Sequence, residues 1–550
     1  MLYKLSRFSL SRIAADKTLS LALISILVAL LLGCGATAPT GNNEPASQPA
    51  VETSHELIDS KPARPASPDE GRLTREIDQL FEQDEFKSGR WGVIVLSLKD
   101  GHKVYARNDD RLFTPASNMK LFPTAIGLEL LGADYRWRTS AYAASPISAD
   151  GTLNGDLVLY GRGAPDLTAG TNASDENSLA RLASDLYDRG LRRVKGNVIG
   201  DESYFRGETS GDGWQWNDVQ WYFGAEASAL SVNNNEVSVN ILPPDKSGMP
   251  VVLANDLNGY VTIENKMAVV SSAERMTVGI HRGLSDNIVR VWGTFPSGSK
   301  GFGARMSVYK PALWAARILV GKLNERGITV EGRAESRDAR QPSPERFDPS
   351  RSNELAFVSS KPLGEIIRAT NKGSINLYAE LILRTIGRER GSMLPAEAPG
   401  GRERGDDETG LAVIKLWLNR SGISTAGLAM HDGSGLSRLN LVTPTSLASL
   451  LAAVSRTAAG PTFRQSLPLS GVDGTLGGRL KDHSEKVAAK TGYLTYDSSL
   501  SGYVTNAADE VFAFSIICND ETGRGNSGRL IDEIVSLLAT YPQPTTQKAK

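Results

Sequence analysis

A serine and a lysine three residues apart could act together as a nucleophile and its base. Ser117 and Lys120 occur in the segment FTPASNMKLFPTAIGLELLG, in which Thr114 and Pro115 favour the start of a helix. Residues three apart lie on one helix face, so the amine could reach the hydroxyl. A desolvated lysine can take the proton of a serine, and a helix N-terminus provides a positive field for an oxyanion. The segment therefore predicts Ser117 as a nucleophile and Lys120 as its base.

A second polar pair, Ser374 and Asn376, occurs where a glycine turn leads into a helix, in ATNKGSINLYAELILRTIG. The serine hydroxyl could pass a proton toward an amine that leaves when a peptide bond is broken. The asparagine amide offers both a donor and an acceptor to a peptide. The pair predicts Ser374 as a proton relay and Asn376 as a substrate-binding residue.

A third group, Lys490, Thr491 and Gly492, ends the strand-like segment EKVAAKTGYL. A cation and a hydroxyl at a strand edge can hold the terminal carboxylate of a substrate. The glycine would let that substrate lie close to the backbone. This group is therefore predicted to bind substrate.

Each of these motifs has looser copies, so none of them is specific alone. Ser-x-x-Lys recurs at 297–300, Ser-x-Asn at 231–233 and 285–287, and Lys-Ser-Gly at 87–89 and 246–248. Pro296 and Gly301 argue against a helix at the first copy, and a lone Ser-x-Asn is more often a turn or a helix cap. The specific signal is the order of a helix-opening SxxK, a helix-capping SxN and a strand-borne KTG.

Metal and histidine chemistry have little support in the sequence. No HExxH, CxxC or GxSxG pattern occurs, and the histidines lie far apart, at His55, His102, His281, His431 and His483. We therefore expect no metal and no other cofactor, and we do not expect a Ser-His-Asp hydrolase.

Strand-like segments near both chain ends predict one antiparallel sheet. A helix is expected from Arg72 to about Phe86, followed by a hairpin in WGVIVLSLKDGHKVYARN that turns at Asp100 and Gly101. Three further strands are expected at about 486–491, 498–506 and 510–519, before an amphipathic helix over 528–541. These elements would belong to a catalytic domain in two segments, 71–141 and 341–542.

The middle of the chain, residues 142–340, alternates short strand-like pieces with Gly, Asn and Pro turns. We expect a β-rich region of two subdomains, inserted into the catalytic domain. One amphipathic helix is expected near its end, over 311–327, with Gly327 as its stop signal. The whole chain is thus predicted to have an α+β multidomain fold.

The first residues resemble an export signal that ends in a lipid-attachment site. Four basic residues precede the apolar run LSLALISILVALLLG, and the following Leu-Leu-Gly-Cys sequence resembles the lipobox of bacterial lipoproteins. We expect a signal peptide over 1–33, lipidation of Cys34 and a Pro- and Ser-rich tether over 34–70. The alternative is an uncleaved membrane anchor with an incidental cysteine. Both alternatives, the lipidated cysteine and the uncleaved anchor, place the body of the protein outside the cytoplasm, in the periplasm or on the cell envelope.

Charge and cysteine content restrict the remaining possibilities. The net charge is −1, and this balance gives no basic patch for nucleic acid, so we expect no nucleic-acid partner. The only cysteine besides Cys34 is Cys518, in the apolar run VFAFSIIC. We therefore expect no intrachain disulfide.

The ordered motifs give the chain a clear family resemblance. It resembles a low-molecular-mass class C penicillin-binding protein, of the D-alanyl-D-alanine carboxypeptidase/endopeptidase family. The long stretch between the SxxK and SxN motifs fits the large insertion of that family, and further similar segments are LYGRGAPDLT, VKGNVIGDESYF, YFGAEASALSVNNNEVSV and MHDGSGLSRLNLVTP. The resemblance implies a serine β-lactamase/penicillin-binding transpeptidase-like domain, an antiparallel sheet flanked by helices.

The resemblance also implies roles for the motif residues. Ser117 would attack a D-Ala-D-Ala or similar cross-link bond of a peptidoglycan stem peptide, and Lys120 would accept its proton. Ser374 and Lys490 would help to protonate the leaving group. The N–H groups of Ser117 and Tyr493 would hold the oxyanion, and Asn376, Thr491 and Gly492 would contact the substrate. β-Lactam antibiotics would acylate the same serine and inhibit the enzyme.

Two other functions remain open at this point. A serine β-lactamase would use the same motifs, but it needs fast deacylation and has no use for an insertion of this size. A non-catalytic wall-binding lipoprotein would keep the fold, although a decayed enzyme has no reason to keep all three motifs. Acylation by a labelled penicillin would separate the last possibility from an enzyme.

Overall fold

The computed structural model describes residues 67–170, 177–245, 248–340, 347–395, 404–522 and 526–542. The chain divides into two units, Met1–His55 and Glu56–Lys550, and all described residues belong to the second. The predicted signal peptide, Cys34 and nearly all of the predicted tether lie outside the described residues. Within the described residues, no helix is both long enough and apolar enough to cross a membrane.

The first helix, α1 (Pro68–Phe81), begins and ends earlier than predicted. The Ser67 hydroxyl accepts a hydrogen bond from the Glu70 amide, and the Glu70 carboxylate accepts one from the Ser67 amide. This reciprocal cap satisfies two amides of the first turn, so the helix starts within the Pro- and Ser-rich stretch. The 3₁₀ turn η1 (Asp84–Phe86) follows as a separate element.

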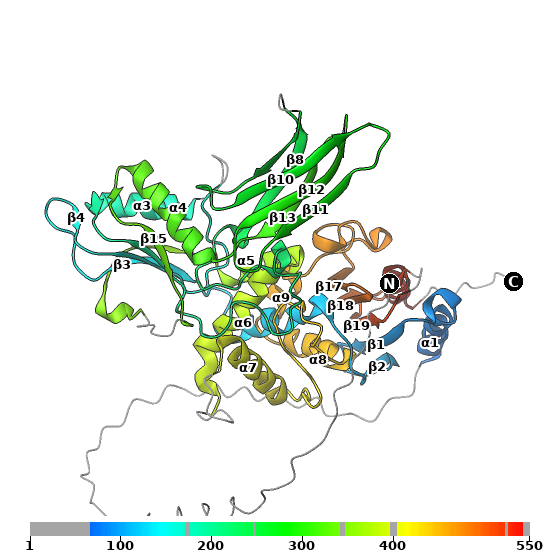
Figure 1. Ribbon diagram of the computed structural model, residues 1–550. Coiled ribbons are helices and arrows are strands. Elements are labelled where there is room, and N and C mark those ends of the chain that lie inside the picture. The colour runs from blue at the N-terminus through cyan, green and yellow to red at the C-terminus, as the bar shows by residue number, and fades with distance from the viewer. Residues whose placement is uncertain are drawn as a thin grey trace, which may run out of the picture. The chain divides into compact units, whose positions relative to one another are not determined.

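One antiparallel sheet combines both ends of the described chain, as predicted. Its order is β17-β18-β19-β1-β2, with bounds β1 (Arg90–Ser97), β2 (Lys103–Arg107), β17 (Val487–Leu494), β18 (Asp497–Thr505) and β19 (Val511–Asn519). Figure 1 shows these strands side by side. β19 pairs with β1 from Arg90 opposite Asn519 to Ser97 opposite Phe512. This pairing joins the two predicted segments of the catalytic domain in one sheet.

Helices cover both faces of this sheet. Apolar side chains of α1 and α10 (Ser527–Thr540) pack on one face, where Ile534 and Leu538 lie in one core with Val93 and Phe514. The other face is covered by helices around the buried α2 (Leu121–Leu131). These helices are α5 (Leu363–Gly373), α6 (Asn376–Arg390), α7 (Asp406–Arg420), α8 (Pro444–Val454) and α9 (Gly460–Ser466). The SxxK motif leads directly into α2, at the centre of this second core.

The first part of the middle region is a five-stranded sheet with two helices. Its order is β15-β7-β5-β3-β16, with bounds β3 (Arg138–Ala143), β5 (Leu157–Tyr160), β7 (Val198–Asp201), β15 (Ala334–Arg337) and β16 (Asn353–Ser359). The helices are α3 (Ser178–Asp188) and α4 (Pro311–Arg326), and α4 ends at the left-handed Gly327 as predicted. Three two-residue strands form a small parallel sheet beside it: β4 (Thr152–Leu153), β6 (Arg193–Val194) and β14 (Thr329–Val330).

This part of the chain differs from the predicted β-rich insertion in two ways. β5, β7 and β15 are parallel, and parallel strands need helical crossovers, which explains the presence of α3. β3 and β16 also carry the sheet beyond both expected limits of the insertion, 142 and 340.

The second part of the middle region consists of two three-stranded sheets, which are all β as expected (Figure 1). One has the order β10-β12-β11 and the other β13-β8-β9. Their bounds are β8 (Glu236–Pro244), β9 (Pro250–Ala254), β10 (Thr262–Val270), β11 (Thr277–Arg282), β12 (Ile288–Pro296) and β13 (Phe302–Ser307). A 3₁₀ turn that precedes them, η3 (Tyr222–Gly224), reaches the candidate active site.

Candidate active site

Ser117 and Lys120 lie on one tight turn just before α2. The turn is the 3₁₀ helix η2 (Ala116–Lys120), and residues three apart are eclipsed in a 3₁₀ helix. The Lys120 Nζ atom lies 2.8 Å from Ser117 Oγ. Ala116, immediately before the serine, has a left-handed φ of 47°. The structure thus brings the predicted nucleophile and base into hydrogen-bond contact.

The Lys120 amine has two further contacts, and both are with pure acceptors. Nζ lies 2.6 Å from Asn376 Oδ1 and 2.6 Å from the backbone oxygen of Ser434. A neutral amine has two N–H groups and one lone pair. If both N–H groups donate to these oxygens, the lone pair remains for the Ser117 hydroxyl. The surroundings of Lys120 therefore suit a proton acceptor.

Ser374 and Asn376 lie at the sharp reversal between α5 and α6. Ser374 caps α5 in the left-handed conformation, and Asn376 is the first residue of α6. While Asn376 Oδ1 accepts from Lys120, Asn376 Nδ2 donates to the backbone oxygen of Phe223 at 2.8 Å. Both halves of this amide are therefore engaged by the protein, although the sequence had suggested that they serve the substrate.

Lys490 brings the third motif to the same place. It lies on β17, and its Nζ atom donates to Ser374 Oγ at 2.8 Å and to the Thr491 backbone oxygen at 2.8 Å. The Asn118 side chain, within the SxxK motif, donates to the Lys490 backbone oxygen at 2.9 Å. All three motifs therefore meet in one cluster of contacts.

Gly492 allows β17 to lie directly against the turn that carries Ser117. A Cβ atom at this position would lie 2.2 Å from Ser499 Oγ, 2.8 Å from the Pro115 backbone oxygen and 3.0 Å from the Ser117 nitrogen. Any side chain would push the strand away from the serine. Beside it, Thr491 Oγ1 donates to Thr475 Oγ1 at 2.7 Å, and the Tyr493 side chain is 76% exposed.

Burial sets the charge state of the two amines. Both lysine side chains are fully buried, and the loss of hydration lowers the pKa of Lys120 to about 7, although the carboxylates of Asp432 and Glu380 oppose the shift. Burial also lowers the pKa of Lys490 well below its usual value, and the nearby charge of Lys120 adds to the effect. Lys120 is thus able to change protonation state near neutral pH.

Three residues near Lys120 were not identified as site residues from the sequence: Glu380, Asp432 and Ser434. Glu380 Oε1 accepts hydrogen bonds from the amides of Gly433 and Ser434, and Asp432 is fully buried. One signal was available for Glu380, because it follows Asn376 by four residues and so shares its helix face. Ser434 acts through its backbone oxygen, which has no signature in the sequence.

The looser copies at 87–89, 231–233 and 297–300 make other contacts, and the copy at 246–248 lies partly outside the described residues. Ser231 Oγ donates to the Ser228 backbone oxygen in a turn of the inserted region, and the Ser297 amide donates to Val270 beyond the end of β12. Lys87 pairs with Asp84 at the surface. These contacts are those of ordinary turns and solvated charges.

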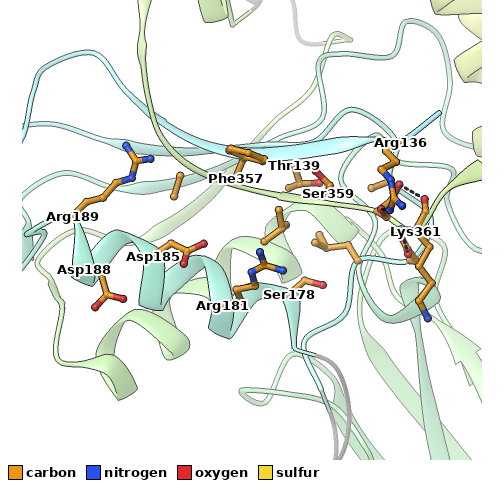
Figure 2. Close-up of a pocket in the computed structure, with 16 residues that line it drawn as sticks. Arg136, Thr139, Ser178, Arg181, Asp185, Asp188, Arg189, Phe357, Ser359 and Lys361 are labelled. Atoms are coloured by element: carbon orange, nitrogen blue, oxygen red, sulfur yellow. Dashed lines mark hydrogen bonds between the residues drawn. The ribbon is translucent and has the colours of Figure 1, made fainter. Parts of the chain in front are cut away.

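A pocket of about 630 Å³ lies elsewhere, between α3 and the strands β3 and β16. Figure 2 shows charged side chains of α3, among them Arg181 and Asp185, on one side of it, and Thr139, Phe357 and Ser359 on the other. Asp166 also lines the pocket and accepts a hydrogen bond from the Lys361 amide at 2.9 Å. None of the residues that line it belongs to the three motifs, so the chemistry and this pocket are separate.

Comparison with known proteins agrees with this geometry. A family model, the D-Ala-D-Ala carboxypeptidase 3 (S13) family, matches residues 73–541. The D-alanyl-D-alanine carboxypeptidase of an Actinomadura species is 31% identical over 489 residues, which cover 85% of each chain. The carboxypeptidase DacB of Haemophilus influenzae is 28% identical over 434 residues, 77% of this chain and 84% of that protein.

Solved structures agree as well. The crystal structure of penicillin binding protein 4 from Haemophilus influenzae matches with a TM-score of 0.70 and 25% identity, over 85% of this chain and 99% of that chain. Fold and motifs thus define a low-molecular-mass class C penicillin-binding protein, with the α+β architecture that was predicted. The chain belongs to the D-Ala-D-Ala carboxypeptidase 3 (S13) family. It is a serine-type D-Ala-D-Ala carboxypeptidase that acts on peptidoglycan.

Replacing Gly492 by alanine should damage both the site and the stability of the fold. The new Cβ atom would overlap Ser499 Oγ and the backbone of the nucleophile's turn, and overpacking of this kind costs about 1–3 kcal/mol. Chemical denaturation should show this loss, and acylation by a labelled penicillin should slow at least about tenfold because the serine is displaced. Gly478→Ala is the control, since a Cβ atom there meets nothing within 4 Å. Equal behaviour of the two variants would contradict the close approach at Gly492.

Proposed function

We propose that Ser117 is the nucleophile of this carboxypeptidase and that Lys120 is its general base. The observation that carries the proposal is the set of three contacts at the Lys120 amine, with Ser117 Oγ, Asn376 Oδ1 and the Ser434 backbone oxygen. The two oxygens occupy the N–H groups of a neutral amine. Its lone pair then accepts the Ser117 proton while Oγ bonds to the carbonyl carbon of the D-Ala-D-Ala peptide bond.

The negative charge of the tetrahedral intermediate is held by the N–H groups of Ser117 and Tyr493 in this proposal. The close approach of β17 at Gly492 to the Ser117 nitrogen supports it, because Tyr493 is the next residue on that strand. Two backbone donors fixed by a helix turn and a strand need no reorganisation during the reaction.

Ser374 and Lys490 carry a proton to the leaving amine. Their contact at 2.8 Å provides a path where the SxN motif meets β17. The Ser374 hydroxyl gives its proton to the amine nitrogen and regains, through the Lys490 amine, the proton that Lys120 took from Ser117, so Lys120 becomes neutral again. The C–N bond then breaks, D-alanine leaves as a neutral amine, and the acyl group stays on Ser117. Water then attacks this ester while Lys120, neutral again, accepts one proton of the water. The ester C–O bond breaks, Lys120 returns the proton to Ser117 Oγ, and the shortened stem peptide leaves with a free carboxylate.

Substrate carboxylate binding is assigned to the strand edge at Lys490 and Thr491. The Thr491 hydroxyl and the Lys490 amine lie on successive residues of β17, which is the edge strand of the sheet. A carboxylate near Lys490 would favour its charged form and would offset the pKa depression caused by burial. Cleavage of peptide cross-links as a DD-endopeptidase follows the same chemistry with a different leaving amine.

β-Lactam antibiotics are proposed to acylate Ser117 as well. Penicillin binding protein 4 from Haemophilus influenzae has been crystallised as a complex with a β-lactam. The strained amide of a β-lactam presents its carbonyl to the same nucleophile, and the acyl group would leave slowly. A serine β-lactamase would differ in releasing it rapidly.

The protein is further proposed to be exported and held at a membrane by lipid on Cys34. The support is the sequence alone, a charged start, an apolar run and the Leu-Leu-Gly-Cys exit. More than one acyl chain holds a protein durably at a bilayer, and a lipidated N-terminal cysteine provides them.

Ser117→Ala should abolish acylation by fluorescent penicillin, because no hydroxyl remains to attack the carbonyl. The matched control is Ser297→Ala, which removes the serine of the competing SxxK copy and should acylate normally. Release of D-alanine from stem peptides and cleavage of cross-linked muropeptides should stop in Ser117→Ala alone. Labelling of Ser117→Ala at the wild-type level would exclude Ser117 as the nucleophile, and rapid release of the label from the wild-type protein would indicate a β-lactamase.

The acylation rate should rise with pH through about 7, the pKa of Lys120. Below that pH the amine is protonated and cannot accept the serine proton, whereas above it the lone pair is free. Lys120→Arg, which stays charged, should lose about 10²- to 10⁴-fold in acylation rate above pH 7 and should not show the rise with pH. Stopped-flow acylation with a penicillin measures both effects. A Lys120→Arg protein that acylates at the wild-type rate would remove Lys120 as the base.

Cys34→Ser should abolish incorporation of radiolabelled palmitate in the producing cell. Cys518→Ala is the control, because Cys518 is buried in β19 and should not carry lipid. Palmitate labelling of both variants would refute the lipid anchor.

A further inference from the structure

The backbone oxygen that contacts Lys120 belongs to a tight turn, residues 432–435, which we call the Asp432 turn. Its geometry is fixed by the Asp432 carboxylate, which is fully buried. The carboxylate accepts hydrogen bonds from the Gly435 and Ser437 amides at 2.8 and 2.7 Å, and from Asn440 Nδ2 at 2.7 Å. The backbone is thus wrapped around a single side chain.

The Asp432 turn also lies directly on the turn of the nucleophile. Gly435 has a left-handed φ of 80°, and a Cβ atom there would lie 1.8 Å from the Ala116 backbone oxygen. From the other side, Glu380 of α6 accepts the Gly433 and Ser434 amides at 3.0 and 2.8 Å. A small shift of the turn would therefore move the Ser434 oxygen relative to the Lys120 amine.

The inserted region adds a further contact to the Asp432 turn. Trp214 Nε1 donates to Asp432 Oδ2 at 2.9 Å. The adjacent Gly213 leaves no room for a side chain, since a Cβ atom would lie 2.6 Å from Ser437 Oγ. The indole N–H of Trp214 is thus bonded to a buried carboxylate of the catalytic domain.

An ion pair and a hydrogen-bond contact hold the segment that carries Trp214. Arg206 makes three hydrogen bonds to the fully buried carboxylate of Asp406 at the start of α7, one from its amide and two from its guanidinium. Asp212 contacts His431, the residue before the Asp432 turn, at 2.7 Å. The segment that leads to Trp214 is therefore anchored at two points before the indole.

We propose that Trp214 is a positioning residue for catalysis, which acts through Asp432 and the Ser434 backbone oxygen on the amine of Lys120. The proposal rests on the proposed role of Lys120 as the base. The charged groups that face this amine are Asp432, Glu380 and Lys490. A displacement of a catalytic group by about 1 Å can cost about 10²-fold in rate. Loss of the Trp214–Asp432 hydrogen bond therefore slows the reaction, although Trp214 acts on Lys120 only through other residues.

Trp214→Phe tests the proposal, because it keeps an aromatic ring and removes only the N–H donor. We expect the acylation rate constant for fluorescent penicillin to fall about five- to fiftyfold, while the dissociation constant of the complex before acylation changes less than about twofold. Trp292→Phe is the matched control: Trp292 lies on β12 of the inserted region and its side chain is 49% exposed. Its acylation rate should equal that of the wild type.

A second variant, Asp432→Asn, places an amide where the indole donates and should slow acylation in the same way. Both changes act on one contact, so the double variant should be no slower than Asp432→Asn alone. If Trp214→Phe does not fold, Asp432→Asn carries the test, with thermal unfolding to separate stability from rate. A rate for Trp214→Phe equal to that of Trp292→Phe, or a loss confined to binding, would overturn the inference. Wild-type acylation by Lys120→Arg would instead overturn the proposed base.

Discussion

The constraint on which the rest of the site depends is the burial of two lysine amines next to each other. An ammonium group taken out of water is costly unless it is paired, and two adjacent ammonium groups also repel each other. The structure surrounds Lys120 and Lys490 with an amide oxygen, two backbone oxygens and two hydroxyls, and with no direct carboxylate contact. Such partners suit neutral amines. The same surroundings that make the lysines costly to charge lower the pKa of Lys120 to about 7, which is what the proposed base requires.

This arrangement explains several features of the fold that would otherwise seem unrelated. The acceptors of Lys120 come from α6 and from the Asp432 turn, and the strand that bears Lys490 is joined to β1 through β18 and β19. Glycine occurs where a side chain would push these elements apart. Gly492 lies against Ser117, and Gly435 lies against Ala116. The close contacts between backbones are what bring groups from distant parts of the chain within hydrogen-bond distance.

Much of this could be predicted from the sequence, and the failures have a common cause. The hairpin at Asp100 and Gly101 and the sheet built from both chain ends were predicted correctly because strands and turns follow local patterns. The three motifs were also found by their local patterns, and the structure brings them into one cluster of contacts. The early start of α1 was missed because its capping box lies within Pro- and Ser-rich sequence. The Ser434 oxygen and the Phe223 oxygen could not be predicted, since any residue supplies a backbone carbonyl. Asn376 was identified from the sequence, but its contacts with Lys120 and with the Phe223 oxygen were not.

The contacts of the inserted region suggest why a penicillin-binding domain tolerates so large an interruption. Phe223 accepts from Asn376, Trp214 donates to Asp432, and Arg206 neutralises Asp406. One half-buried and two fully buried polar groups of the catalytic domain thus have partners in the insertion. Loss of the Arg206 partner would leave the buried charge of Asp406 without its counter-ion, which costs more than the about 1–3 kcal/mol of an unsatisfied buried hydrogen-bonding group. Asp432 would keep its donors from its own turn and lose one hydrogen bond. The insertion is therefore part of the structure that holds the active site together, and the catalytic segments before and after it depend on it for a stable arrangement of Lys120.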